Sequence, residues 1–202
     1  MGNGFDAVFL LFVQQPQCPC QTQEIQVVIY GVVDGVLLVE FHDTGLRGTH
    51  QFCHVLQSEL RRNGDVLGID LDPYCVVIEG GTNDIAAFTL ESTFERIKKM
   101  ADTARKAHID VIVGSVPPSN LFPKLPDFHP EDRIIELNRM IKEWADAEGI
   151  PYADYYSVLV DDAKGLKKAY QKDTVHPNGA GYTEMEKVIV PILKSVLSHH
   201  IK

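Results

Sequence analysis

The chain has 202 residues, of which 45% are hydrophobic and 23% are charged, and its formal net charge at pH 7 is −9. These values are ordinary for one soluble globular domain, and an acidic balance without a Lys/Arg run argues against a nucleic-acid partner. No apolar run reaches the roughly 18 residues that a membrane-spanning helix needs.

The opening stretch and the cysteines bear on the cellular compartment. MGNGFDAVFLLFVQQ has a short apolar core without basic residues before it, which disfavours a secretory signal. The four cysteines (18, 20, 53 and 75) show no paired metal-ligand spacing, so free thiols in a reducing compartment are the simpler interpretation. We therefore expect a cytoplasmic protein without a metal or another cofactor.

Residues 1–36 have an atypical pattern. The stretch IQVVIYGVVDGVLLVEF holds two β-rich runs that flank Asp34-Gly35, a strong hairpin signal because Asp-Gly tolerates the positive φ angles of a tight turn. A parallel partner strand would instead need a crossover of a dozen or more residues. VFLLF, at residues 8–12, is a further candidate strand. An antiparallel hairpin that feeds a parallel sheet would be unexpected.

From about residue 37 short apolar strands alternate with amphipathic helices, the pattern of a parallel sheet with crossover helices. Strands are expected at 36–41, 74–79, 109–118 and 150–156. Helices are expected at about 49–62, from a capping box at Ser92-Thr-Phe-Glu95, between Pro130 and Gly149, and from about Ala180 to His199 with a kink at Pro191. We see neither repeats nor a linker, so residues 1–202 form one domain.

Two loops that leave strands of this pattern carry glycines and polar groups. In open α/β sheets ligands bind where such loops meet, at the carboxyl ends of the strands. In FHDTGLRGTH, Gly45 and Gly48 let the backbone approach a ligand, and the Gly48 N–H lies just before a helix start. In EGGTNDI, Asn83 offers an amide that can hold a developing oxyanion. Each loop alone is more often an ordinary turn or cap.

A third segment, DTVHPNGAGY at 173–182, places Asp173 three residues before His176. At that spacing the carboxylate can accept from one ring nitrogen and leave the other nitrogen as a base for a hydroxyl proton. An isolated Asp-x-x-His is more often a turn with a solvated histidine. The combination of the three segments is more informative than any one of them.

These segments resemble blocks of the SGNH, or GDSL-type, hydrolases, which include esterases, lysophospholipases, thioesterases and carbohydrate acetylesterases. GGTND matches the asparagine block, TGLRGT resembles the glycine block, and DTVHPN matches the histidine block apart from Thr174, where glycine is frequent. GSVPPSN, IIELNRMIKEWA, IPYADYYSVLVD and HPNGAGYTEME also fit, so the resemblance covers residues 37–195.

The resemblance implies an α/β fold, a flavodoxin-like three-layer sandwich with a central, mostly parallel sheet of about five strands flanked by helices. It implies hydrolysis of small-molecule carboxylic esters by acyl transfer. It makes His176 the base and Asp173 the group that orients it, and it makes the Asn83 amide and the Gly48 N–H the oxyanion-hole donors. The family's nucleophile is a serine in a Gly-Asp-Ser block at the end of the first strand.

That serine is missing, because the first serine of the chain is Ser58. The block aligns either with Gly31-Val32-Val33 or with Val13-Gln14-Gln15, and the second alignment leaves more room for a crossover. Gly64-Asp65 has the letters of the block but lies just upstream of the third strand. Ser115 is the best remaining serine by position, and Cys18, Cys20, Thr44 and Thr49 are remote substitutes. The nucleophile is therefore unknown.

Two hypotheses follow from the missing serine. In the first, the protein is an ester hydrolase whose residues 13–36 are not genuine family sequence, as the composition of QQPQCPCQTQ suggests. In the second, it is a catalytically inactive ligand-binding protein that keeps the pocket. The sequence identifies neither the acyl and alcohol parts of a substrate nor the oligomeric state.

Overall fold

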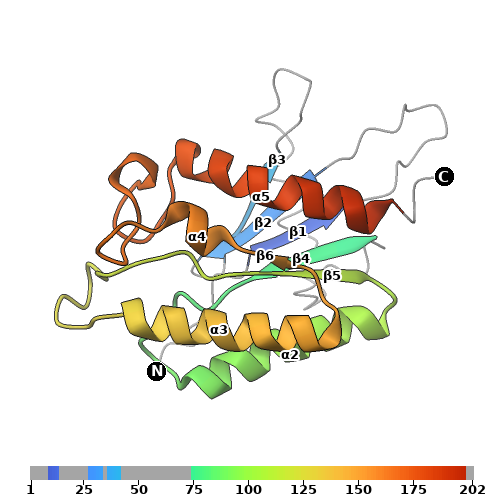
Figure 1. The fold of residues 1–202 in the computed structure, drawn as a ribbon, viewed down its shortest axis with the longest axis horizontal. Coiled ribbons are helices and arrows are strands. Elements are labelled where there is room, and N and C mark those ends of the chain that lie inside the picture. Colours follow the sequence, from blue (N-terminus) through green and yellow to red (C-terminus); the bar gives the residue numbers. More distant parts are fainter. Residues whose placement is uncertain (1–8, 14–26, 34–35, 42–73, 199–202) are drawn as a thin grey trace.

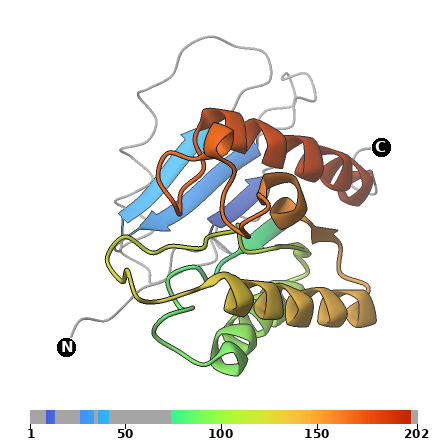
Figure 2. The ribbon, with the colours of Figure 1, turned by 60° about the vertical axis from the view of Figure 1, so that its left-hand side comes forward.

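The computed structural model describes residues 9–13, 27–33, 36–41 and 74–198, and in the first three ranges it describes the backbone alone. These ranges hold one six-stranded sheet in the order β3-β2-β1-β4-β5-β6 (Figure 2). The strands are β1 (Phe9–Val13), β2 (Val27–Val33), β3 (Val36–Phe41), β4 (Cys75–Glu79), β5 (Asp110–Gly114) and β6 (Tyr152–Ala153). Gly48 and the helix expected at 49–62 lie outside the described residues.

The sheet has a parallel half and an antiparallel half. Strands β4, β5 and β6 pair in parallel, whereas β1 is antiparallel to β4, and β2 and β3 form a hairpin closed by the pair Val33 and Val36. The predicted hairpin is thus confirmed. The sheet has six described strands where about five were expected, and the β1–β3 half is antiparallel. Only two residues separate β2 from β3, too few for the crossover that a parallel pair needs.

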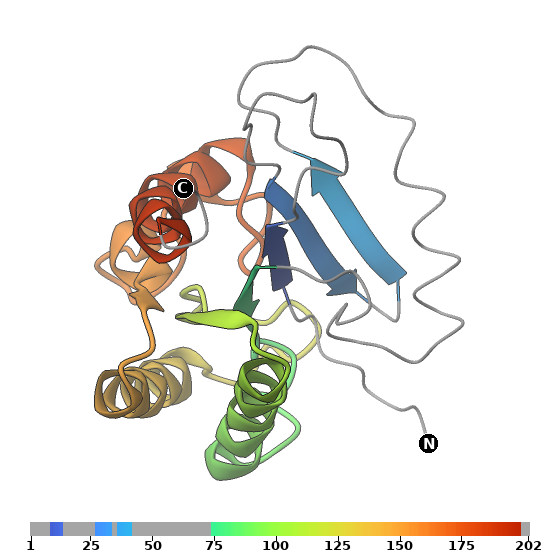
Figure 3. The same ribbon diagram turned by 90° about the vertical axis from the view of Figure 1, so that its right-hand side faces the viewer.

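Helices cover both faces of the sheet, which confirms the three-layer α/β class. They are α2 (Leu90–Lys106), α3 (Glu131–Glu148), α4 (Tyr155–Leu159) and α5 (Gly179–Leu197), with a short 3-10 helix, η2 (Lys168–Tyr170). Viewed along the sheet, α2 and α3 lie on one side and α4 and α5 on the other (Figure 3). Each side has its own buried apolar cluster. No helix in the described ranges is long and apolar enough to cross a membrane.

The helix ends agree with the sequence-based expectation at Gly149 and differ from it at Ser92. The capping box expected at Ser92 was wrong, because α2 begins at Leu90 and the Thr89 side chain accepts from the Ser92 N–H at 3.2 Å. Gly149 ends α3 with φ 67°, a left-handed conformation that glycine adopts at little cost. Helix α5 continues through Pro191.

Strand β4 is buried on both of its faces and ends in an unusual residue. Val76 and Ile78 pack toward α2 and α3, and Cys75 and Val77 join the opposite cluster. Because side chains alternate along a strand, Glu79 faces the second side. It is 3% exposed, and its Oε2 has no hydrogen-bond partner among the described residues. Burial raises the pKa of Glu79 to about 8, so this carboxyl keeps its proton at neutral pH.

Gly81 allows the chain to turn sharply after β4. Its φ is +118°, and a Cβ at this position would lie 2.9 Å from Leu137 Cδ2. Both the backbone angle and the lack of space therefore require glycine. The turn that follows carries Asn83.

We predict that Glu79→Gln reduces the pH dependence of stability. Between the ordinary pKa of 4.5 and the folded-state pKa of about 8, the folded protein keeps a proton that the unfolded chain loses. The free energy of unfolding therefore falls as pH rises through this window, by up to about 1.4 kcal/mol per pH unit. Urea denaturation across the window should show a smaller slope for Glu79→Gln. The exposed Glu186→Gln is the control, and equal slopes for all three proteins would contradict the prediction.

We predict that Gly81→Ala destabilises the fold by about 2 kcal/mol, because alanine adopts this φ poorly and its Cβ meets Leu137. Chemical denaturation at one pH measures the change. Gly179→Ala is the matched control, since a Cβ there meets nothing within 4 Å and the position lies in α5. The control should leave stability unchanged or raise it by up to about 1 kcal/mol. Equal stabilities for the two variants would refute the assignment.

Candidate active site

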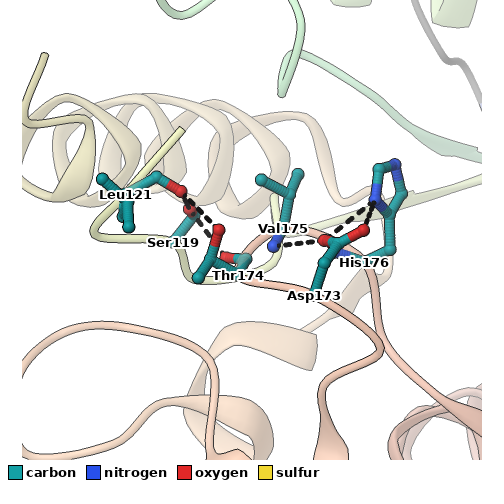
Figure 4. Close-up of polar contacts among 6 residues, drawn as sticks. All are labelled: Ser119, Leu121, Asp173, Thr174, Val175 and His176. Carbon is teal, nitrogen blue, oxygen red and sulfur yellow. Dashed lines mark hydrogen bonds and ion pairs between the residues drawn. The ribbon is translucent and has the colours of Figure 1, made fainter. Parts of the chain in front are cut away.

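Asp173 and His176 are in direct contact (Figure 4). His176 Nδ1 lies 2.8 Å from Oδ2 of Asp173 and 3.0 Å from Oδ1. An ionised carboxylate only accepts hydrogen bonds, so Nδ1 carries the proton in this contact, and in the neutral ring Nε2 keeps its lone pair. Within the described part of the chain Nε2 has no hydrogen-bond partner. The contact predicted from the three-residue spacing is present, and it leaves one ring nitrogen available as a base.

The backbone around Asp173 keeps its carboxyl charged. The carboxylate also accepts from the N–H groups of Val175 and His176, both at 2.8 Å. Partial burial alone would raise the pKa of Asp173, but these two backbone hydrogen bonds and the bond from the His176 ring outweigh it, so the pKa is lowered. The acidic partner of the pair is therefore ionised at neutral pH, as a group that orients an imidazole must be.

The loop that carries the pair is closed at its base. Gln171 and Pro177 form a bridge, and the Lys172 N–H donates to the His176 carbonyl at 2.8 Å. The Asn178 side chain caps α5 by accepting from the Gly181 N–H at 3.0 Å, and its amide donates to Ala169 and Gln171 carbonyls. The sequence thus builds a short loop directly before a helix, with Asp173 to Val175 at its tip.

Asn83 is exposed on a turn whose neighbours are anchored. The Asp84 and Ile85 N–H groups both donate to the Gly81 carbonyl at 3.0 Å. The carboxylate of Asp84, which is buried, accepts from Arg96 at 2.9 Å. From α3, Arg133 donates to the carbonyls of Ile85 and Phe88. Asp84 therefore anchors the turn through its side chain. The Asn83 side chain is exposed, on a backbone that these hydrogen bonds fix.

The two loops lie at the same edge of the sheet. Because β4 and β5 are parallel, their carboxyl ends share one edge, and Asn83 follows the first of them. The tip of the Asp-His loop bonds to residues that follow the second strand, since Thr174 Oγ1 donates to the Leu121 carbonyl at 2.8 Å. Figure 1 shows the loops 115–130 and 160–178 together on the left, where α3 and α5 begin. Gly48 lies outside the described residues.

The structure gives no nucleophile among the described serines. Ser115 is fully buried, and its Oγ accepts from the Tyr156 N–H at 2.8 Å, so the earlier choice of Ser115 as the best remaining serine was wrong. Ser119 is 1% exposed and bonded to carbonyls. The other described serines (92, 157, 195 and 198) lie in α2, in α4 and at the end of α5. Ser58, Cys18, Cys20, Thr44 and Thr49 lie outside the described residues.

Strand register argues against both alignments of the missing block. Phe9 pairs with Glu79, and Val13 pairs with Cys75, so β1 ends at the edge opposite Asn83. The favoured alignment at Val13-Gln14-Gln15 was therefore wrong, because an antiparallel strand reverses the end that meets the site. Strand β2 ends at the edge where β4 also ends and Asn83 follows, but β1 lies between β2 and β4. Neither strand places a nucleophile where the first family strand would.

The described residues also offer no metal site, since they contain no group of three or more His, Cys, Asp or Glu side chains able to hold an ion. Cys75 is buried at the opposite end of β4. Burial, and then the charge of Asp110, raise the pKa of its thiol to about 12, which makes it unsuitable as a thiolate nucleophile. The chemical groups at this edge are therefore an imidazole, a carboxylate and an amide.

Comparison with known proteins places this fold among GDSL-type enzymes. The chain superposes on a GDSL-like lipase of Bacteroides thetaiotaomicron with a TM-score of 0.62 and 39% identity, covering 70% of this chain and 71% of that one. A candidate acylhydrolase of Bacteroides fragilis gives a TM-score of 0.63 and 38% identity, covering 70% of each chain. A multidomain esterase of Ruminococcus flavefaciens is 29% identical over 142 residues, which are 64% of this chain and 16% of that protein.

One family model also matches, over residues 35–183, which is well over half of the chain. The match spans Gly48, Asn83, Asp173 and His176. With the three-layer α/β fold and the solved relatives above, it shows that this chain belongs to the GDSL-like lipase/acylhydrolase family.

Proposed function

We propose that this protein hydrolyses carboxylic esters of small molecules, with His176 as the general base. The observation that carries the proposal is the bonded pair of Asp173 and His176, whose free Nε2 belongs to a loop at the carboxyl edge of the parallel strands. Membership of an acylhydrolase family supports the reaction class.

His176 moves the protons in this scheme. Nε2 takes the proton of the attacking O–H group while a new C–O bond forms at the ester carbonyl carbon. The imidazolium that results is stabilised by the ionised Asp173 on the Nδ1 side. It then gives its proton to the alcohol oxygen as the old C–O bond breaks. General acid–base catalysis of this kind typically contributes about 10²–10⁴-fold.

Asn83 holds the carbonyl oxygen as it becomes an oxyanion. Its amide has two N–H donors, and the turn around it is fixed by Asp84 and Arg133. A fixed donor needs no reorganisation when charge develops, and the loss of one such donor typically costs about 10²–10³ in rate. The Gly48 N–H is proposed as the second donor, on the family resemblance alone.

The identity of the attacking group separates two versions of the proposal. In the serine-type version a hydroxyl outside the described residues attacks first and forms an acyl-enzyme, which water then hydrolyses. In the direct version His176 activates water itself, and no covalent intermediate forms. A base and an oxyanion hole without a nucleophile retain about 10³-fold acceleration over water in related machinery, so weak activity alone does not choose between them.

The rival function is ligand binding without catalysis. It is favoured by a specific observation, that the two described serines after β5, Ser115 and Ser119, are buried and already hydrogen-bonded. In that case the imidazole and the amide bind a carbonyl or carboxylate compound and release it unchanged. Turnover and covalent labelling distinguish this function from hydrolysis.

We predict that His176→Ala lowers the hydrolysis of p-nitrophenyl acetate by about 10²–10⁴-fold, because the base is lost. Exposed imidazoles react slowly with this ester in any protein, so a second histidine variant is needed. His108 is exposed before β5 at the opposite edge and has φ 61°, which asparagine tolerates, so His108→Asn is the matched control. Equal rates for the wild type and His176→Ala would show that His176 is not the base.

We further predict that a fluorophosphonate probe distinguishes the mechanisms, since it labels only an activated nucleophile. Labelling together with a burst of p-nitrophenol would establish the serine-type version. Turnover that depends on His176, without label or burst, would establish direct attack by water. If purified protein shows neither turnover nor label, the hydrolase proposal fails and the binding function replaces it.

A further inference from the structure

The contact between Asp173 and His176 is too exposed to fix the loop by itself. The two side chains are 44% and 54% exposed, and even a fully charged pair with this exposure typically contributes only about 0–1 kcal/mol. Catalysis nevertheless requires the imidazole to stay within a fraction of an ångström of its productive position. Backbone hydrogen bonds hold the base of the loop at Lys172 and His176, so the position of Asp173 depends also on what fixes the tip.

Two hydroxyl groups join that tip to the loop after β5 (Figure 4). Ser119 Oγ donates to the Thr174 carbonyl at 2.9 Å and lies 3.2 Å from the Leu121 carbonyl. In the reverse direction, Thr174 Oγ1 donates to the Leu121 carbonyl at 2.8 Å. Thr174 lies between Asp173 and the two N–H groups that the Asp173 carboxylate binds. We call these hydrogen bonds the 119–174 clip.

The partner side of the clip is rigid. The Asn138 side chain from α3 accepts from the Val116 N–H at 2.7 Å and donates to the Val116 carbonyl at 2.9 Å. The Tyr156 N–H, at the start of α4, donates to Ser115 Oγ. Two buried prolines, at 117 and 118, then restrict φ up to Ser119, which is 1% exposed. The clip therefore ties a half-exposed loop to the buried Ser119, and its second bond reaches the more exposed Leu121.

We infer that Ser119 and Thr174 are positioning residues that hold the Asp173–His176 pair in place through the 119–174 clip. The inference rests on the proposed function. Neither hydroxyl touches the reacting atoms, since both protons go to backbone carbonyls. Ser119 and Thr174 align the base and take no part in the chemical step.

The first test measures the tautomer of the His176 ring by NMR and does not require the protein to be an active enzyme. Ser119→Ala and Thr174→Val each remove one hydroxyl, and ring ¹⁵N shifts report the ratio of the Nδ1–H to the Nε2–H form of neutral His176. We expect each variant to lower this ratio by about tenfold, because a loosened loop breaks the bond from Nδ1 to Asp173. Thr174→Ser keeps the hydroxyl and should restore the wild-type ratio.

The control variants remove equivalent hydroxyls far from the site. Thr103 Oγ1 donates to the Lys99 carbonyl within α2, and Ser198 Oγ donates to the Ser195 carbonyl at the end of α5. Thr103→Val and Ser198→Ala should leave the ratio unchanged. Circular dichroism and melting curves identify folded variants, and if Ser119→Ala does not fold, Thr174→Val alone decides.

The second test uses p-nitrophenyl acetate turnover. Misplacement of the base should lower kcat by about 10- to 100-fold while KM changes little, because substrate binding does not use the clip. If the wild-type protein shows no turnover, the proposed function fails. The ring measurement would still test the 119–174 clip. If folded Ser119→Ala and Thr174→Val both keep the wild-type ratio, the inference is overturned, whatever happens to kcat.

Discussion

Parallel pairing of β4 with β5 is the constraint on which the site depends. It brings the carboxyl ends of two strands to one edge, where the turn with Asn83 leaves the first strand and the loop with Ser119 leaves the second. Helices fix both exits, with Arg133 and Asn138 of α3 bonding to the turn and to the loop respectively. The Asp-His loop joins this edge from α5. One helix therefore sets the backbone of both strand exits.

Much of the fold over residues 74–198 was predictable from sequence, for identifiable reasons. Strands β4 (75–79) and β5 (110–114) are β-branched and apolar, and Pro130 and Gly149 bracket α3 as their backbone preferences require. The contact between Asp173 and His176 also followed from spacing, since a carboxylate at that distance bonds both its own turn and the ring. Local chemistry was sufficient for these features.

Other features depend on contacts that no local pattern reveals. The direction of β1 was not predictable, because five apolar residues pair equally well either way and only the register with β4 settles it. Ser115 resembled a candidate nucleophile at a strand end, and only the burial beneath Tyr156 excludes it. The role of Ser119 is also hidden in sequence, since its partner Thr174 lies 55 residues further along. Long-range partners were the missing information.

Glu79 has an electrostatic consequence for the oxyanion hole that we propose. It ends β4 four residues before Asn83, the proposed donor to the oxyanion. Because the carboxyl is protonated up to about pH 8, the formal charge of −9 overstates the acidity of the protein at neutral pH by one unit. The missing negative charge is that of Glu79, at the end of β4, the strand that leads into the site. A glutamate at this position thus adds a dipole to the local field instead of a repelling monopole.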